Sequence, residues 1–151
     1  MIIVPSVEKE VAVLGANYPD GVAAGERIAR KDIEVASWKL PEQKCARHLK
    51  AYALGDGERD SIELCAQLED IQALVTDDYL AFIAATRFGL QVWMLPDLVI
   101  HLVEKGYLKV DQAGDILEAI RPRYRIGVIE HSLERLQKVA KNVSGESDRT
   151  S

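Results

Sequence analysis

The sequence is short of several residue types and patterns, and each shortage excludes something. It has only two cysteines, Cys45 and Cys65, both in apolar surroundings, so we expect buried free thiols in a reducing compartment rather than a disulfide framework. No apolar run approaches the ~20 residues of a membrane span. The opening MIIVPSVEKE also lacks the features of a signal peptide. We therefore expect a soluble, cytoplasmic protein with no membrane partner.

A strong net charge is also absent, since 19 Lys and Arg face 24 Asp and Glu for a formal net charge of -5. Such a chain is not a general binder of polyanions, so any contact with nucleic acid needs a local basic patch. One candidate is RPRYRIG, where Arg121, Arg123 and Arg125 surround an aromatic residue and can grip an RNA backbone. A solvated loop between two helices is the favoured alternative for this stretch.

What the sequence does have is enough apolar material for one domain. At 151 residues and 48% hydrophobic, it can bury a full core but is too short for two ordinary domains. We expect a single domain over residues 1–141, followed by a polar, disordered tail over residues 142–151.

Short β-like runs alternate with longer helical patterns along the chain. Strands are expected at residues 1–4, 32–38, 73–76 and 90–95. Helices are expected at about 6–14, capped by Ser6, at 22–30, from Pro41 to about 54, at 58–68, at 77–88, at 96–105 and in two segments across 111–141. Two glycines, Gly89 and Gly106, are expected to close helices. The alternation predicts an α/β fold, with a mostly parallel sheet between two layers of helices.

Two adjacent acids, Asp77 and Asp78, follow the expected strand 73–76, at the end of a strand where ligands of such sheets bind. Taken alone they are best explained as a helix start, with Thr76 or Asp77 as the N-cap. Glu58 in LGDGERDSIEL and Glu10 in VPSVEKEV are each an ordinary acid in a first helical turn. The glycines beside Glu58 do not form a phosphate loop, because the Lys-Ser/Thr ending is missing.

Taken in order, VPSVEKEV, LGDGERDSIEL and ALVTDDYLAFIAATRFGLQV resemble the PIN-domain family over about residues 2–136. Smaller shared features are Trp38 and the stretch LVEKGYL. The resemblance implies a metal-dependent nuclease, mostly acting on RNA, of a kind that often forms the toxin half of a toxin–antitoxin pair. It also implies a cluster of acids around Mg²⁺ or Mn²⁺. Residue by residue, Glu10, Glu58 and Asp78 match the catalytic metal ligands, and Asp77 matches a neighbouring catalytic acid.

The sequence departs from that family at its start. Family members begin with a strand that ends in an Asp, whereas this chain starts at what matches their second strand. An alignment that makes residues 1–4 the first strand places Pro5 where the Asp belongs. We therefore expect an N-terminally truncated PIN-like sheet. Residues 1–4 and 73–76 then pair directly, or a partner chain covers their edges, or the native protein carries the missing strand upstream of Met1.

The sequence thus favours a relative of metal-dependent endoribonucleases with an incomplete acidic site and weak or no activity. In an active form, metal-activated water would attack a phosphodiester. The alternative is a non-catalytic protein-interaction module, or a homo-oligomer, that uses the opened sheet edge. A nucleotide-binding Rossmann-like domain ranks last, because its glycine fingerprint is missing. The expected partners are RNA, an antitoxin protein or a second copy of the chain.

Overall fold

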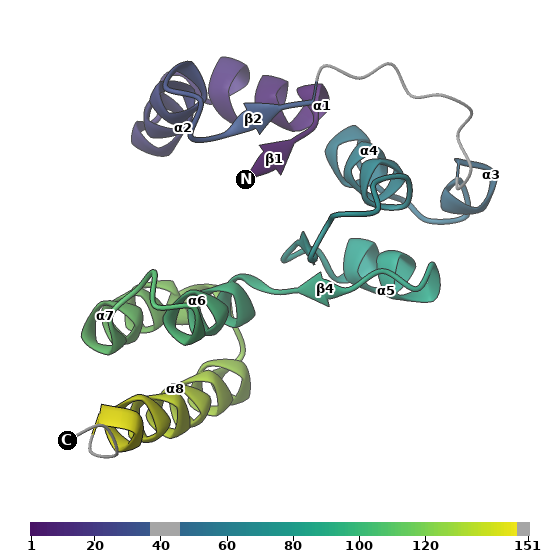
Figure 1. Ribbon diagram of the computed structural model, residues 1–151. Coiled ribbons are helices and arrows are strands. Elements are labelled where there is room, and N and C mark those ends of the chain that lie inside the picture. Colours follow the sequence, from purple (N-terminus) through teal and green to yellow (C-terminus); the bar gives the residue numbers. More distant parts are fainter. Residues whose placement is uncertain (37–45, 148–151) are drawn as a thin grey trace. The chain divides into compact units, whose positions relative to one another are not determined.

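The computed structural model describes residues 1–36 and 46–147, which divide into two compact units, Met1–Val92 and Trp93–Ser151 (Figure 1). The sequence predictions that concern Trp38, Pro41 and Cys45 lie outside the described residues. The single domain expected over residues 1–141 stays a prediction. Within the described ranges, no helix combines the length and the apolar character that crossing a membrane requires.

The first unit alternates short strands with helices, as the sequence predicts. Its elements are β1 (Ile2–Ile3), α1 (Pro5–Glu8), the π-helix η1 (Lys9–Leu14), α2 (Pro19–Ala29), β2 (Glu34–Val35), α3 (Ala46–Leu49), α4 (Asp56–Cys65), β3 (Leu74–Val75), α5 (Tyr79–Arg87) and the start of β4 (Val92–Trp93). All four expected strands are present, each only two residues long. The helix expected to run to about residue 54 ends earlier, at Leu49.

The start of α1 differs from the sequence prediction in its cap. The N-cap is Val4, which makes no side-chain capping bond, and Pro5 opens the helix with its fixed φ. Ser6 lies inside the helix, and its hydroxyl donates a hydrogen bond to Asp60 Oδ2 at 2.6 Å. The predicted capping role of Ser6 is therefore wrong, because its hydroxyl binds a carboxylate of α4, 54 residues along the chain.

The strands pair in two short sheets. β1 lies parallel to β2, with Ile2 opposite Glu34 and Ile3 opposite Val35. β3 pairs with β4, and α5 connects them. The α/β class and the parallel pairing are confirmed. Among the described strands each has a single neighbour, so the direct pairing of residues 1–4 with 73–76 does not form.

Helix α4 packs against the surroundings of both sheets. Its residue Ile62 is fully buried in a cluster with Leu74 of β3 and with the buried alanines of α5. Two residues later, Leu64 belongs to a second cluster with Val4 and Ala36, which flank β1 and β2. The 3.6-residue period separates these positions around the helix, so α4 supports both strand pairs from one element.

The second unit is helical apart from the end of β4. It contains α6 (Leu95–Glu104), α7 (Val110–Ile120), the 3₁₀ turn η2 (Arg121–Arg123) and α8 (Ile126–Ser147). Its core consists of side chains from all three α-helices: Val99, Ile100, Val103, Ala113, Leu117 and Leu136.

The predicted closing glycines are confirmed, since Gly89 and Gly106 adopt φ of 76° and 74° just after α5 and α6. Helix α8 runs on to Ser147, beyond the end near residue 141 that the sequence predicts.

Candidate acidic pocket

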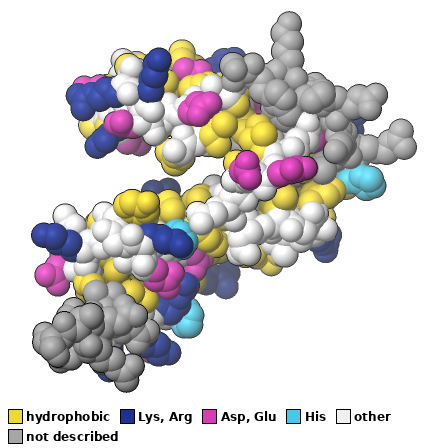
Figure 2. Space-filling model, in the orientation of Figure 1, with side chains coloured by type: hydrophobic (Ala, Val, Ile, Leu, Met, Phe, Trp, Pro, Cys, Tyr) yellow, Lys and Arg dark blue, Asp and Glu magenta, His cyan; other side chains and the backbone are white. Residues whose placement is uncertain are grey.

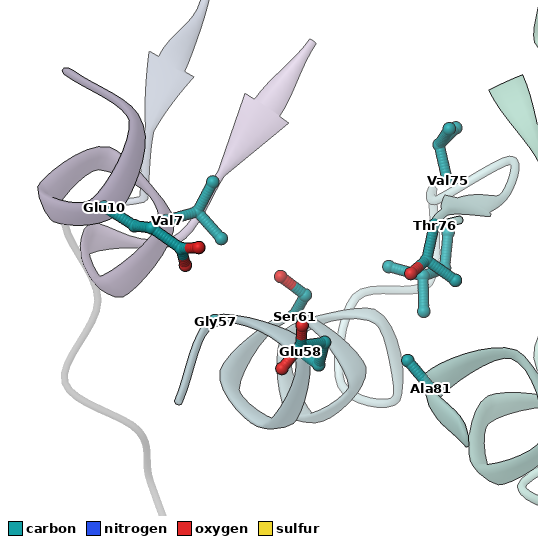
Figure 3. A pocket seen from close by; sticks show the side chains of 9 residues that line it. Val7, Glu10, Gly57, Glu58, Ser61, Val75, Thr76 and Ala81 are labelled. Atoms are coloured by element: carbon teal, nitrogen blue, oxygen red, sulfur yellow. The ribbon is translucent and has the colours of Figure 1, made fainter. Parts of the chain in front are cut away.

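The first unit holds a pocket of about 160 Å³ where α1, η1, α4, β3 and the start of α5 meet (Figure 3). Apolar side chains form part of its wall, and two carboxylates and two hydroxyls supply its polar groups. The lining residues are Val7, Glu10, Gly57, Glu58, Ser61, Leu74, Val75, Thr76 and Ala81. Two of the predicted site residues, Glu10 and Glu58, are therefore brought together, although 48 positions separate them in the sequence.

Glu10 reaches the pocket because α4 has no side chain at Gly57. A Cβ built at Gly57 would lie 3.0 Å from Val7 Cγ2 and 3.5 Å from Glu10 Oε2. The missing side chain lets α1 and η1 lie against the first turn of α4, and the bond between Ser6 and Asp60 fastens the same contact. A helix N-terminus also favours a nearby carboxylate. The sequence showed Gly57 only as part of the LGDGERDSIEL motif, because the close approach of two helices leaves no local signal.

Glu58 is the third residue of α4 and is half-buried. Its carboxylate turns back toward the helix start, where a Cβ on Gly55 would collide with Glu58 Oε2. In Figure 3, Ser61 lies beside Glu58 on the same helix, across the pocket from Val75 and Thr76. Within residues 1–36 and 46–147, neither Glu10 nor Glu58 forms an ion pair with a Lys or Arg. The pocket is thus acidic and carries no neutralising cation from the described chain.

Asp78 is the N-cap of α5, where its Oδ1 accepts a hydrogen bond from the Ala81 backbone N–H at 2.7 Å. The hydroxyl of Thr76 accepts a bond from the Asp78 N–H at 3.2 Å. The sequence placed this cap at Thr76 or Asp77, so the expected capping occurs one or two residues later than predicted. Asp78 does not line the pocket, although its neighbours Thr76 and Ala81 do. Asp77 is exposed.

Carboxylate and hydroxyl oxygens are the hard ligands that Mg²⁺ and Mn²⁺ prefer. The pocket supplies two such carboxylates, from Glu10 and Glu58, and the hydroxyls of Ser61 and Thr76. Nowhere in the described part of the chain do three or more His, Cys, Asp or Glu side chains converge closely enough to hold a metal ion. The pocket as it stands therefore does not fit a tightly held resident ion. The roles predicted for Glu10, Glu58, Asp77 and Asp78 stay predictions.

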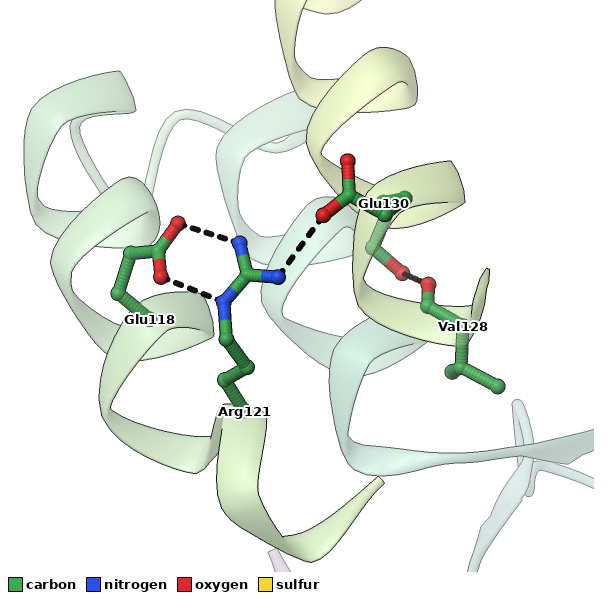
Figure 4. A network of polar contacts seen from close by, with 5 residues as sticks. Glu118, Arg121, Val128 and Glu130 are labelled. Atoms are coloured by element: carbon green, nitrogen blue, oxygen red, sulfur yellow. Dashed lines mark hydrogen bonds and ion pairs between the residues drawn. The ribbon is translucent and has the colours of Figure 1, made fainter. Parts of the chain in front are cut away.

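The arginines of RPRYRIG differ in their availability. Arg121 donates to Glu118 Oε2 and Oε1 at 2.7 Å each and to Glu130 Oε1 at 2.9 Å (Figure 4). This hydrogen bonding from Arg121 holds the pKa of the Glu118 carboxyl below its usual value. Arg123 and Arg125 are exposed and form no ion pair with a described acid. Of the three arginines, Arg123 and Arg125 are therefore the ones available to pair with another molecule. On the face shown in Figure 2, basic and acidic side chains are intermixed.

A comparison with known protein families shows to which family this chain belongs. A family model described as DUF3368, a PIN domain, matches residues 1–140. The chain belongs to the PIN-domain family. Comparison with the curated proteins and with the solved structures gave no match. The match covers both compact units, so the helices α6 and α7 and most of α8 are part of the PIN sequence as well.

Membership of the PIN family confirms the resemblance drawn from the sequence and gives the chain a nuclease-like fold. The structure adds roles that the motifs did not indicate. Ser6 and Asp60 fix α1 against α4, Gly57 makes room for Glu10, and Ser61 and Thr76 bring hydroxyls to the pocket. The sequence had assigned Ser6 and Thr76 to helix caps and placed Gly57 in the LGDGERDSIEL motif, whereas Ser61 could have been found because it lies one helical turn after Glu58 and so shares its face.

Proposed function

We propose that this chain is a nuclease-like PIN domain whose acidic pocket binds Mg²⁺ or Mn²⁺ weakly and whose cleavage of RNA is weak or absent. The observation that carries the proposal is the pairing of Glu10 and Glu58 in one pocket of a PIN domain. Family membership supports RNA as the substrate class and an antitoxin-type protein as a partner. The proposed site consists of Glu10 and Glu58, with Asp78 and Asp77 beside it.

We expect weak metal binding because the pocket offers few charged ligands. Two carboxylates are a minimal set for a hard divalent cation, and affinity rises with the number of charged oxygen ligands. The Oδ1 atom of Asp78 already accepts the capping bond of α5, so this carboxylate has less capacity for a metal. We therefore expect a dissociation constant for Mn²⁺ on the order of millimolar.

Metal binding can be tested without activity, by following the electron paramagnetic resonance signal of free Mn²⁺ during titration with protein. Glu10→Gln and Glu58→Gln should each weaken binding about tenfold, because each removes one of two charged ligands. Glu134→Gln is the matched control, since Glu134 is an exposed acid of α8. Equal binding by all four proteins would show that the pocket is not the metal site.

Cleavage is tested by incubating the purified chain with a mixed RNA substrate and Mn²⁺. We expect slow cleavage or none, and any cleavage should disappear in Glu58→Gln and Asp78→Asn. Rapid cleavage by the unmodified chain would contradict the proposed weak activity. Cleavage that persists in both variants would exclude these acids from the reaction.

A second candidate function, a protein-interaction module, is favoured by one edge of β1 and one edge of β3 that no other described strand covers. The carbonyl oxygens of Met1 and Ile3 accept bonds from Glu34 and Ala36, on the β2 side. Because backbone groups alternate along a strand, the N–H and C=O of Ile2 point to the opposite edge. In β3 the Leu74 N–H donates to Gln91 O at 2.9 Å, so the backbone groups of Val75 point away from β4.

Unpaired strand edges are templates for an added strand. Such an addition can be tested with Val75→Pro, which removes the N–H at the open edge of β3 and leaves the bond between Leu74 and Gln91 in place. If a strand of another chain is captured there, light scattering should show a complex that Val75→Pro abolishes. A chain that forms the same complexes with and without this change would contradict edge pairing.

A further inference from the structure

Helices α7 and α8 of the second unit lie side by side (Figure 1). Between them is a groove of about 420 Å³, the α7–α8 groove, to which both helices contribute lining side chains. None of its lining residues belongs to the acidic pocket, which lies in the first unit. The groove is therefore a separate feature of the chain, and its shape, floor and charge indicate what can fill it.

The floor of the groove is apolar and continuous with the core of the second unit. Leu136 lines the groove and is itself a buried member of the core cluster. Val110 and Leu133 also line the groove, are half-buried and pack against the same cluster. An apolar side chain that enters the groove would extend this packing and lose its contact with water. An occupant should therefore present an apolar face.

The lining residues of α8 follow the spacing of one helix face. They are Leu133, Leu136, Gln137 and Ala140, at positions i, i+3, i+4 and i+7. Side chains in such rows form the ridges between which a neighbouring helix packs. Two helices with facing rows thus form a seat for a third, which is how amphipathic helices dock in grooves of other proteins.

Gly114 of α7 lines the groove at a position where the fold does not require glycine. Glycine is unfavourable inside a helix, and Gly114 lies within Val110–Ile120. Its φ is not positive, and a Cβ built on it would meet no atom within 4 Å. Neither the backbone conformation nor a neighbour in the chain accounts for the missing side chain. What the glycine does is leave room in the groove for the close approach of another backbone.

The charge of the groove restricts its occupant further. Asp111 and Asp115 line it four positions apart on α7, both exposed, and neither forms an ion pair with a Lys or Arg whose side chain the structure describes. Lys138 and Lys141 of α8 are exposed but do not line the groove. Two carboxylates repel an RNA backbone and an anionic lipid surface. They complement a helix that carries Lys or Arg at the same spacing.

We propose that the α7–α8 groove binds a basic amphipathic helix of another protein. The apolar residues of that helix enter the groove beside Gly114, and its Lys or Arg residues pair with Asp111 and Asp115. The apolar contact supplies most of the affinity, because pairs between exposed charges contribute little. The two acids select basic helices over acidic ones. This inference goes beyond the proposed function, because it uses neither the acidic pocket nor a strand edge.

The probe is a fluorescein-labelled peptide of about 15 residues, the length at which such helices begin to form in water. It has Leu on one helical face and Lys on the other, and a second peptide has Glu in place of every Lys. Fluorescence anisotropy measures the binding of each peptide to the full chain. The Lys peptide should bind at least about tenfold more tightly than the Glu peptide. Equal binding of the two peptides, or no binding of the Lys peptide at about 100 µM chain, would overturn the proposal.

Gly114→Leu tests whether the peptide occupies the groove. The new side chain has open space, so the helix should form at least as well, while the groove is filled. Binding of the Lys peptide should weaken at least about tenfold. Gly127→Leu is the matched control, because Gly127 is an exposed glycine of α8 with equally open space and does not line the groove. Circular dichroism checks that both variants fold, and unchanged binding by Gly114→Leu would overturn the proposal.

Charge neutralisation separates the groove from the overall acidity of the chain. Asp111→Asn combined with Asp115→Asn should weaken binding about threefold to tenfold and reduce its dependence on salt. Glu69→Gln combined with Asp70→Asn is the control, since it removes the same charge from exposed acids of the first unit. Equal weakening by the two pairs would mean that the peptide responds only to net charge, and would overturn the proposal. So would a mass of two copies in sedimentation equilibrium that Gly114→Leu abolishes, because a second copy would then fill the groove.

Discussion

In the second unit, α6, α7 and α8 each contribute buried side chains to one cluster, in which Ile100 and Leu117 are fully buried. In the first unit, by contrast, the η1–α2 hairpin (residues 9–29) buries no side chain larger than glycine. The remaining core of that unit is split between two clusters on α4. Both units are rich in apolar residues, so composition does not explain the difference. The kind of element explains it, because three consecutive helices can close around one shared core, whereas strands of two residues in two-stranded sheets cannot.

The comparison also concerns function. The well-packed helices of the second unit hold a satisfied ion-pair network around Arg121. The first unit holds the acidic pocket, the open strand edges and the exposed hairpin. Unpaired groups and exposed apolar surface lower stability, and both are typical of surfaces that bind something else. The features on which the proposed functions rest, the acidic pocket and the strand edges, thus lie in the first unit.

The largest expected effect comes from breaking the packed unit. Leu117→Ala removes a fully buried side chain and should lower the free energy of unfolding by about 2–5 kcal/mol. Its neighbour Ile116 is 36% exposed, so Ile116→Ala should cost less than about 1 kcal/mol. Urea denaturation followed by circular dichroism measures both. Equal losses in the two variants would contradict the burial pattern of α7.

A smaller effect is expected from separating α1 from α4. Ser6→Ala removes the hydrogen bond to Asp60 and leaves a partly buried carboxylate with one donor fewer. Bonds to charged groups contribute about 1.5–3 kcal/mol, so we expect a loss of about 2 kcal/mol by urea denaturation. Ser61→Ala is the control, because it removes the same hydroxyl from α4, where Ser61 lines the pocket and forms no such bond with a described residue. If Ser6→Ala also binds Mn²⁺ more weakly, the bond between Ser6 and Asp60 helps to position Glu10 in the pocket.

A loss of about 1 kcal/mol is expected from Asp78→Ala, because it removes the side-chain cap of α5. Asp78→Asn keeps an oxygen that accepts the Ala81 N–H and should keep most of that stability. The pair of variants separates two roles, since Asn preserves the cap but removes the charge that a metal ion would use. In the absence of metal, Asp78→Ala should unfold at a lower temperature than Asp78→Asn. Both variants should lose Mn²⁺ affinity to the same extent.

The smallest effect concerns Cys65, a free cysteine partly buried against the α4–α5 cluster. Burial raises the pKa of its thiol from 9.0 to about 11. The unfolded chain therefore loses this proton first, so the stability linked to Cys65 is complete below pH 9 and decreases as pH rises toward about 11. Since the group is partly exposed, the change should be well below the ~1.4 kcal/mol per pKa unit of a fully buried group.

Chemical denaturation of the unmodified chain and of Cys65→Ala at several alkaline pH values measures this change. The difference in stability between the two should shrink as pH rises from 9 to about 11. A difference that stays constant over that range would show that the thiol ionises as readily in the folded chain as in the unfolded one.

Local signals gave reliable predictions where neighbouring residues decide the structure. Gly89 and Gly106 end their helices as predicted, and the run Leu74–Val75 is a strand. Predictions were less accurate where a residue far along the sequence offers a side chain another hydrogen-bonding partner. Ser6 has the chemistry of a cap, but the carboxylate of Asp60 lies within reach and forms a stronger, charge-assisted bond. Likewise, the cap of α5 is Asp78 rather than Thr76 or Asp77, since the helix begins later than the pattern indicated.

The sequence by itself determined the α/β alternation and the PIN family, because both depend on the spacing of apolar residues, glycines and acids along the chain. Only the tertiary structure decided which acids meet. Glu10 and Glu58 converge because Gly57 admits a neighbouring helix, while Asp78 is engaged as a cap. The tertiary structure also decided that the apolar residues of the η1–α2 hairpin are exposed. Burial depends on contacts between segments, and a sequence pattern states only which side chains would benefit from such contacts.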